Sequence, residues 1–251
     1  MKNEFVVISN VQRFLSGYER VEKRAAIEKC FMVVEGEPGR GKTSTAEWFA
    51  IQNDLPIIRA KREWNSRWML EDILDCLGSE PDRTFKEMYR QAVRVLAGRA
   101  ESARAASVPY AVVIDEADHI VTSQKMMETL RDITDQVEVP VILVGMGRLI
   151  KALTRYKQIS SRVSAEVTFL GLTADDTRRL IAGRSEIEVA DDLSIHLHKA
   201  SNGYAREVLE GIGSIERVGR RLGRAVTLAD MEGQVLLTDR VTGKSVTVRA
   251  E

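Results

Sequence analysis

A glycine-rich segment early in the chain restricts its fold more than any other feature. Residues 36–43 read Gly-Glu-Pro-Gly-Arg-Gly-Lys-Thr, which matches the pattern G-x-x-x-x-G-K-[ST]. The three glycines of this segment let backbone N–H groups turn inward and hold phosphate groups. We expect Lys42 to reach the β- and γ-phosphates of a nucleotide and the Thr43 hydroxyl to coordinate Mg²⁺.

The residues on either side of this segment favour the same interpretation. Residues 31–34 are an apolar run typical of a buried strand, and residues 43–50 read as a helix. The order strand, loop, helix places a helix N-terminus at the phosphates. The segment is therefore predicted to be a P-loop that binds ATP, with these nucleotide contacts: Gly36, Glu37, Pro38, Gly39, Arg40, Gly41, Lys42, Thr43 and Ser44.

A second motif predicts hydrolysis. Residues 111–114 form an apolar strand that is followed by Asp115 and Glu116, the Walker B pattern. We expect Asp115 to hold Mg²⁺ through water, and Glu116 to orient or activate the attacking water. An adjacent acidic pair on a surface loop is usually only solvated, but here the pair follows a buried strand downstream of a P-loop. The two motifs predict an ATPase that uses Mg²⁺, with Lys42 and Glu116 acting in catalysis.

Composition and charge limit the class of protein. The chain has 251 residues, of which 44% are apolar and 29% charged, as in ordinary soluble globular domains. No apolar run approaches the ~18 residues that span a membrane, and the first residues lack a signal-peptide pattern. Cys30 and Cys76 have no metal-binding spacing, so we expect a cytoplasmic protein. The formal net charge is zero, so nucleic acid would have to meet a local basic patch.

Strands and helices alternate over the first two thirds of the chain. The strands are expected at residues 31–34, 55–60, 111–114, 139–144 and 163–170. The helices are expected at residues 11–29, 43–50, 68–77, 84–104 and 126–137. This alternation predicts an α/β fold with a parallel, five-stranded sheet flanked by helices.

The pattern changes after Gly171. Three helical segments follow, and then an alternating stretch at 235–248 that reads as a β-hairpin turning at Thr242 and Gly243. The three helical segments are expected at residues 174–182, 191–200 and 205–222. The sequence therefore predicts three parts: an ATPase core at 1–171, a helical lid at 172–232 and a hairpin tail at 233–251.

The order of these parts resembles an AAA+ ATPase. Arg162 follows Ser161 just before the fifth strand, which is similar to the Ser-Arg motif of clamp-loader and initiator relatives. The resemblance implies that Arg162 reaches the nucleotide of a neighbouring subunit and assists catalysis there, with Arg155 as the competing candidate. Residues 202–206 resemble the sensor 2 pattern, which implies that Arg206 turns back onto the γ-phosphate. The alternative for each arginine is a solvated side chain.

One part departs from the AAA+ pattern. The fourth strand is followed by Gly145 and Met146, where the family usually has the polar residue called sensor 1. Water positioning would then depend on Glu116 with another group, or hydrolysis would stay slow until a partner completes the site.

A closer resemblance is to the phage Mu B-type transposition ATPases and their relatives in Tn7-like elements. It rests on these segments: residues 58–61, Trp64, 68–70, 114–119, 128–133, 141–146 and 161–163. It implies a bacterial cytoplasmic protein that binds duplex DNA when ATP is bound, assembles into a helical filament or ring, and delivers target DNA to a transposase. Larger members carry an N-terminal helical DNA-binding domain, which we expect to be absent because about thirty residues precede the first strand.

A basic segment after the second strand is the expected DNA surface. Residues 59–68 interleave basic residues with Trp64 and Trp68, and Lys61, Arg62 and Arg67 are the predicted contacts to phosphates. The alternative is that both tryptophans are core or interface anchors and the charges are solvated. A second stripe of Lys86, Arg90 and Arg94 lies on one face of the expected long helix. No base-reading motif is visible, so DNA binding should be independent of sequence.

Three functions are compatible with these features. The first is a DNA-dependent ATPase that selects transposition targets. The second is another AAA+ DNA-loading factor, such as a replication initiator or helicase loader. The third is a nucleotide-gated DNA-binding module with little turnover. Residues 115–118 read Asp-Glu-Ala-Asp, as in RNA helicases, but those enzymes need a second RecA-like domain that this chain has no room for.

Overall fold

The chain packs into two compact units in a computed structural model that describes residues 1–240 and 242–249. The larger, here called the sheet unit, comprises Arg13–Glu37 and Lys42–Phe169. The smaller, here called the helical unit, comprises Met1–Gln12, Pro38–Gly41 and Leu170–Glu251. The three-part division with boundaries at residues 171 and 232 stays a prediction.

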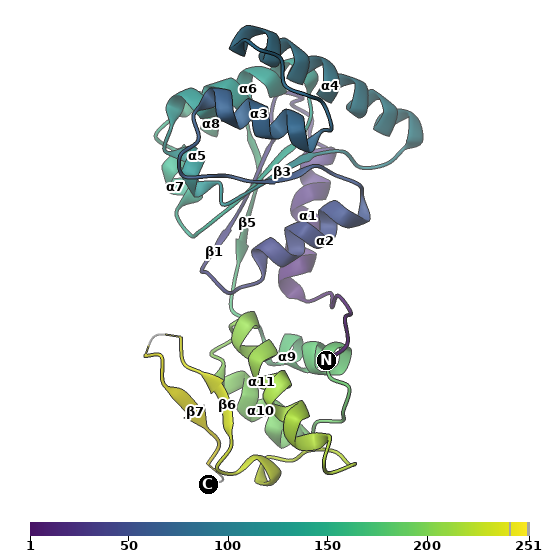
Figure 1. Cartoon of the computed structure of the whole chain (residues 1–251), viewed down its shortest axis with the longest axis vertical. Coiled ribbons are helices and arrows are strands. Elements are labelled where there is room, and N and C mark those ends of the chain that lie inside the picture. Colours follow the sequence, from purple (N-terminus) through teal and green to yellow (C-terminus); the bar gives the residue numbers. More distant parts are fainter. Residues whose placement is uncertain (241, 250–251) are drawn as a thin grey trace. The chain divides into compact units, whose positions relative to one another are not determined.

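A five-stranded parallel sheet forms the centre of the sheet unit, in the order β2-β3-β4-β1-β5 (Figure 1). The strands are β1 Phe31–Gly36, β2 Ile57–Arg59, β3 Val112–Asp115, β4 Val141–Val144 and β5 Val163–Phe169. Since every pairing is parallel, all five strands end at the same edge of the sheet. Only β4 separates β1 from β3, so the P-loop and the acidic pair leave the sheet close together. The predicted α/β fold and its parallel sheet are confirmed.

Helices cover both faces of this sheet (Figure 1). They are α1 Ser9–Glu22, α2 Lys42–Gln52, α3 Ser66–Cys76, α4 Phe85–Ala106, α5 Asp118–Val121, α6 Gln124–Val137, α7 Leu149–Leu153 and α8 Lys157–Ser160. Alternate residues of β1 face opposite sides: Phe31 and Val33 pack with α3, α4 and α6, whereas Met32 and Val34 pack with α1 and α2. Helices on both faces explain why the central strand β4 is apolar throughout, whereas the edge strand β5 alternates buried apolar residues with exposed polar ones.

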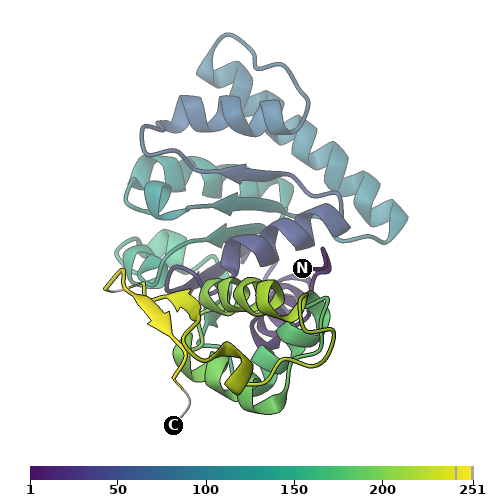
Figure 2. The same ribbon diagram turned by 60° about the horizontal axis from the view of Figure 1, so that its bottom comes forward.

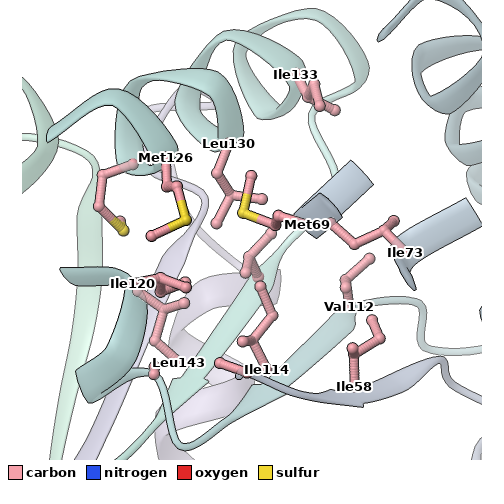
Figure 3. Packing of buried hydrophobic residues seen from close by; sticks show 14 of the residues in the cluster. Ile58, Met69, Ile73, Val112, Ile114, Ile120, Met126, Leu130, Ile133 and Leu143 are labelled. Carbon is pink, nitrogen blue, oxygen red and sulfur yellow. The ribbon is translucent and has the colours of Figure 1, made fainter. Parts of the chain in front are cut away.

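Strand and helix side chains interlock in the core on the α3 face. Figure 3 shows Ile58, Ile114 and Leu143 of the strands packed beneath Met69 of α3 and Leu130 of α6. Met69 and Ile114 are completely buried, and each such side chain contributes roughly 1.5–3 kcal/mol of burial free energy. This core fixes the position of β3, and so of the acidic residues that end it.

The first helix ends earlier than the sequence predicts. It was expected to continue to residue 29, but it ends at Glu22. The guanidinium of Arg24 donates to the carbonyls of Val21 at 2.8 Å and Ile27 at 3.0 Å. The bond to Val21 satisfies a carbonyl at the end of the helix, and the bond to Ile27 holds the following residues in a turn. The short helices α5, α7 and α8 were also missed, because four or five residues carry too little periodicity to detect.

The helical unit contains three helices and an antiparallel hairpin. Its elements are α9 Ala174–Arg184, α10 Asp191–Ala200, α11 Ala205–Gly219, a 3₁₀ turn at Ala229–Met231, β6 Val235–Thr238 and β7 Ser245–Thr247. The predicted helical lid and terminal hairpin are thus confirmed as elements, although α11 ends at Gly219 rather than at residue 222. Val241, Ala250 and Glu251 of the predicted tail lie outside the described residues. No helix in the described part of the chain has the length and apolar character needed to cross a bilayer.

Candidate nucleotide site

The P-loop lysine is held by its own loop. Lys42 begins α2 and is only 8% exposed, and its ammonium donates to the carbonyls of Gly36 at 2.6 Å and Glu37 at 2.8 Å. Gly36 has a φ of +155°, and a Cβ there would lie 2.7 Å from the Phe169 carbonyl oxygen. Only glycine fits at this approach of two backbones. The start of the loop is therefore held close to the Phe169 backbone by its glycine.

The two residues predicted to hold Mg²⁺ lie together. The Thr43 hydroxyl donates to Oδ2 of Asp115 at 3.1 Å, and Asp115 is 4% exposed. A hydroxyl and a carboxylate are oxygen ligands that suit Mg²⁺, which usually takes its other ligands from water and phosphates. The described residues contain no group of three or more His, Cys, Asp or Glu side chains placed to hold a metal.

Glu116 lies at the sheet edge in an unusual backbone conformation. Its φ is +54°, in the left-handed region that residues other than glycine rarely adopt. Its carboxylate is flanked by two side chains: Arg59 Nε lies 3.6 Å from Oε1, and His119 Nε2 lies 3.6 Å from Oε2. Arg59 Nη2 also lies 3.5 Å from Oδ2 of Asp115. The carboxylate that was predicted to activate water thus has a nitrogen-bearing side chain 3.6 Å from each oxygen.

Sequence reasoning missed Arg59 and His119 as members of this site. Arg59 ends β2 directly opposite Asp115 in the parallel register, which only strand pairing reveals. His119 offered a local signal, because it follows Glu116 by three residues at the start of a helical turn.

The end of β4 has a physical reason for lacking a polar side chain. A Cβ at Gly145 would lie 2.4 Å from Oδ2 of Asp118 and 2.6 Å from Cδ1 of Leu149. The same Asp118 oxygen accepts a hydrogen bond from the Met146 amide at 2.7 Å. The Asp118 carboxylate thus occupies the space that a side chain on residue 145 would need.

The outer part of the P-loop, Pro38–Gly41, belongs to the helical unit. The Arg206 amide at the start of α11 donates to the Gly39 carbonyl at 3.3 Å. The guanidinium of Arg40 lies 3.7 Å from the centre of the Tyr204 ring and donates to the Gly203 carbonyl at 2.8 Å. Arg206 is thus next to the P-loop, whereas the Arg40 side chain packs on Tyr204; their phosphate contacts stay predictions.

A family comparison decides the class of this protein. The model of the AAA domain matches residues 27–153, which span β1 to α7 and include both motifs. The chain belongs to the AAA domain family. Together with the fold, this makes it an ATPase.

Similar proteins are consistent with this AAA assignment. A "Potential ATP-binding protein" of Staphylococcus aureus is 23% identical over 203 residues, which cover 72% of this chain and 73% of that protein. The Aeropyrum pernix ORC2 protein, in its ADPNP-ADP complexes, has the same fold with a TM-score of 0.62 at 13% identity, covering 89% of this chain and 67% of that chain. The Aeropyrum pernix ORC1 protein in complex with DNA has a TM-score of 0.57 at 16% identity, covering 85% of this chain and 60% of that one.

The two candidate trans arginines of the AAA protein differ in their surroundings. Arg162 makes a two-point ion pair with Asp135: Nε lies 2.9 Å from Oδ1, and Nη2 lies 3.0 Å from Oδ2. The hydrogen bonds to Asp135 raise the pKa of Arg162 above its usual value. Arg155 is exposed, and the described residues give its side chain no ion pair. Arg162 would have to leave Asp135 to reach another subunit.

The predicted DNA contacts are all exposed on the sheet unit, but two of them are paired. Lys61 Nζ lies 2.6 Å from Oδ2 of Asp72, and Arg67 Nε lies 2.8 Å from Oε1 of Glu71. Arg62 has no ion pair among the described residues and lines a cavity of about 510 Å³. Other side chains that line this cavity are Arg67, Phe85, His119 and Lys125.

The two tryptophans of this segment have different environments. Trp64 is 5% exposed and donates its indole N–H to Oδ2 of Asp72 at 2.8 Å, so it is a core residue. Trp68 is 37% exposed and lies under the Lys61 ammonium at 5.2 Å. The second stripe, Lys86, Arg90 and Arg94, is exposed along α4. Within the described residues these three side chains form no ion pairs.

Proposed function

We propose that this AAA ATPase binds duplex DNA in its ATP-bound state and acts in selecting transposition targets. DNA binding is supported by one short segment that connects the acidic pair to a group of exposed cations. It starts at Arg59, whose guanidinium contacts both Asp115 and Glu116, and runs directly into the exposed cations Lys61, Arg62 and Arg67. A phosphate bound by these cations would therefore lie only a few residues from the side chain that contacts the proposed water-activating glutamate.

The proposed roles at the nucleotide follow from the residues present. Lys42 and the P-loop amides bind the triphosphate, and Thr43 with Asp115 holds Mg²⁺. Mg²⁺, when bound, would neutralise charge on the phosphates. Glu116 orients the attacking water, Arg206 contacts the γ-phosphate, and Arg162 or Arg155 serves a neighbouring subunit. For Glu116 to act on water, its contacts with Arg59 and His119 have to loosen.

Two of the three cations proposed to contact DNA are already paired with acidic side chains. Asp72 and Glu71 already pair with Lys61 and Arg67, so a DNA phosphate has to compete with these carboxylates. Exposed pairs of this kind are worth only about 0–1 kcal/mol, so the competition is feasible. Arg62 needs no such exchange. Since the whole chain has zero formal charge, several subunits must add their contacts to bind DNA firmly.

The finer part of the proposal is assembly on DNA and delivery of that DNA to a transposase. It is supported by the resemblance of the segments around residues 58–70 and 114–119 to the Mu B-type ATPases. The ORC1 protein in complex with DNA supplies a precedent for DNA binding on this fold.

Electron microscopy with duplex DNA tests the assembly. We expect filaments or rings on DNA with ATP and bare DNA with ADP. Equal coverage in both nucleotides would contradict nucleotide control, and bare DNA in both would contradict DNA binding. If a transposase gene lies beside this one, a strand-transfer assay with that transposase tests target delivery. If a replicative helicase gene stands there instead, the loader alternative is favoured.

A nucleotide-gated module with little turnover is the second candidate. The observations that favour it are the engaged Glu116 carboxylate and the missing polar side chain at Gly145. Measuring ATP turnover with and without DNA separates the two. A rate that rises with DNA supports the ATPase cycle, whereas a low rate that DNA leaves unchanged supports the gated module.

A further inference from the structure

The C-terminal hairpin is anchored firmly to α11 in the helical unit (Figure 2). Leu236 and Leu237 of β6 are 0% and 1% exposed. The amide and hydroxyl of Thr238 both donate to Oε1 of Glu210 on α11, at 3.0 Å and 2.9 Å. The chain is therefore fixed in place two residues before Arg240.

Arg240 extends from this anchored strand to the P-loop tip, Pro38–Gly41, which is part of the same unit. Its Nη1 donates to the Pro38 carbonyl at 2.5 Å. The same atom lies where a side chain on Gly39 would begin, because a Cβ there would be 2.9 Å from it. The glycine at this position, with φ +85°, thus leaves room for the guanidinium against the loop backbone.

The guanidinium is held in orientation by two further side chains. It lies 4.3 Å from the centre of the Tyr204 ring, and its Nε is 3.8 Å from Oε1 of Glu207. Glu207 is 5% exposed, and its second oxygen has no hydrogen-bond partner among the described residues. A buried carboxylate is costly without a cation nearby, and Arg240 supplies a positive charge beside Glu207 as well as a donor to the loop.

Two arginines pack on the Tyr204 ring, one from the hairpin and one from the P-loop tip. Arg40 of the P-loop tip also packs on it, with 3.7 Å from its guanidinium to the ring centre. Arg240 reaches Pro38 from the hairpin, and Arg40 reaches Gly203 from the loop. The conformation of the P-loop tip is thus set by a cluster of Arg40, Tyr204, Glu207 and Arg240. The sequence gives no sign of this cluster, because Arg240 follows Pro38 by 202 residues.

We propose that Arg240 is a positioning residue for nucleotide binding, which the C-terminal hairpin supplies to the P-loop. By binding the Pro38 carbonyl, Arg240 fixes the conformation of the loop tip for contact between its amides and phosphates, and it adds positive charge beside the loop. This inference rests on the proposed role of residues 36–43 as the ATP-binding loop. By thermodynamic reciprocity, a nucleotide that needs this loop conformation also stabilises the hairpin.

Nucleotide affinity of Arg240 variants tests the proposal. Arg240→Ala should weaken binding of both ATP and ADP about tenfold, as expected for one lost hydrogen bond to a charged group. Arg240→Lys should recover part of that loss, because it keeps the charge and a donor. Lys244→Ala is the matched control: it removes a cation of the same hairpin that is exposed and has no described contact with the P-loop. A loss confined to ATP would overturn the role, because it would indicate direct contact with the third phosphate.

Hydrogen exchange provides a readout that a merely structural role would not change. In the wild type, ATP should slow exchange of the amides at 235–238 and 245–247, and Arg240→Ala should abolish this effect. Lys42→Ala distinguishes failure of the Arg240 role from failure of the P-loop assignment. If it removes binding while Arg240→Ala and Arg240→Lys bind like wild type, only the inference fails. If Lys42→Ala also binds normally, the P-loop assignment itself fails.

Discussion

At the scale of single residues, the nucleotide site is defined by where each charge is placed. The Lys42 ammonium is almost fully buried and is held by two loop carbonyls. Asp115 and Glu116 are adjacent in sequence, yet Asp115 is buried against Thr43 whereas Glu116 is 46% exposed between Arg59 and His119. This difference separates the residue expected to hold a metal from the residue expected to act on water.

Lys42→Ala should abolish ATP binding. The phosphates would lose the cation that the P-loop directs at them, and the two carbonyls that now accept from the ammonium would lose their donor. Equilibrium binding of a fluorescent ATP analogue measures this, with Lys86→Ala, an exposed lysine of α4, as the control. Wild-type affinity in Lys42→Ala would refute the P-loop assignment.

Glu116→Gln should retain ATP binding and lose turnover. The amide keeps the shape of the side chain but cannot accept a proton from water, and general-base catalysis typically contributes about 10²–10⁴-fold. A steady-state ATPase assay with a parallel binding assay checks both halves. DNA complexes of this variant should also last longer, since hydrolysis no longer ends them. Normal hydrolysis by Glu116→Gln would remove Glu116 from its proposed role.

Mixed assemblies test whether Arg162 acts in trans. Arg162→Ala should leave ATP binding intact and lower hydrolysis only in assembled protein. Mixing it with Glu116→Gln subunits should restore some activity, because some interfaces then combine an intact Glu116 with an intact Arg162. Asp135→Asn is the matched control, since it breaks the ion pair within one subunit but leaves the arginine in place. Absence of recovery at every mixing ratio would favour Arg155 or a role in cis.

At the scale of elements, buried polar side chains fix the ends of helices and the entry of the chain. Asp176 is 3% exposed in the first turn of α9, where it completes a capping box with Thr173. It also accepts hydrogen bonds from the amide of Ser9 at 2.8 Å and from its hydroxyl at 2.6 Å. One carboxylate thus joins α9 to the N-terminal segment of the same unit.

Acid should loosen α9 through Asp176. Burial raises the pKa of this carboxyl, but the hydrogen bonds from Ser9 and Thr173 outweigh burial and place the pKa below its ordinary value. A depressed folded pKa means that the stabilisation is complete above the unfolded value of about 3.9 and is lost as the pH falls below it. Hydrogen exchange of α9 amides from pH 6 to pH 3 measures this. Asp176→Asn should remove this pH dependence and cost about 1 kcal/mol at neutral pH.

The exposed neighbour in the same turn is the control for this effect. Asp175 has a side chain that is 63% exposed, and among the described residues its ion pair is with Arg179 in the next turn. Asp175→Asn should leave exchange in α9 nearly unchanged at both ends of the pH range. If both variants behave alike, the effect comes from net charge rather than from the Asp176 hydrogen bonds.

The elements that the sequence predicted correctly are those with strong local patterns. Every strand bound of the sheet lies within two residues of its predicted place, because four short runs rich in apolar residues and the alternating pattern of β5 are bounded by glycine, proline or charged residues. Lys42, Thr43 and Asp115 came from motif spacing alone. Arg59, Asp118 and Arg240 did not, because each gains its role from a segment distant in the sequence or from packing around a glycine. The early end of α1 is accompanied by hydrogen bonds from the side chain of Arg24, which hydrophobic periodicity does not report.

At the scale of the whole molecule, charge is balanced overall and concentrated locally. Acidic and basic side chains number 37 each, so long-range attraction to DNA is weak. The cations after β2 are therefore expected to act at contact distance and in several subunits at once. The affinity of an assembly for DNA should therefore depend strongly on salt concentration, whereas the affinity of an isolated chain should depend on it weakly.

The salt dependence of DNA binding identifies the surface. Replacing Lys61, Arg62 and Arg67 with Ala should flatten the slope of log K against log salt by up to about 0.9 for each lost phosphate contact. Arg62→Ala should account for the largest part, because Lys61 and Arg67 are already paired with acids. Filter binding with two unrelated duplexes measures slope and sequence preference, and ATP binding should survive. Replacing Lys86, Arg90 and Arg94 is the comparison: if only that set changes the slope, the DNA surface lies on α4.

The crowding at the end of β4 has an evolutionary consequence. Because the Asp118 carboxylate lies 2.4 Å from where a Cβ on Gly145 would be, neither position can change freely while the other stays the same. Gly145→Asn alone should displace both the Asp118 carboxylate and the Leu149 side chain, whereas in Gly145→Asn with Asp118→Ala only the Leu149 side chain has to move. Relatives that carry a polar residue at the end of this strand should therefore have a small residue in place of Asp118, so the two positions should be inherited as a pair.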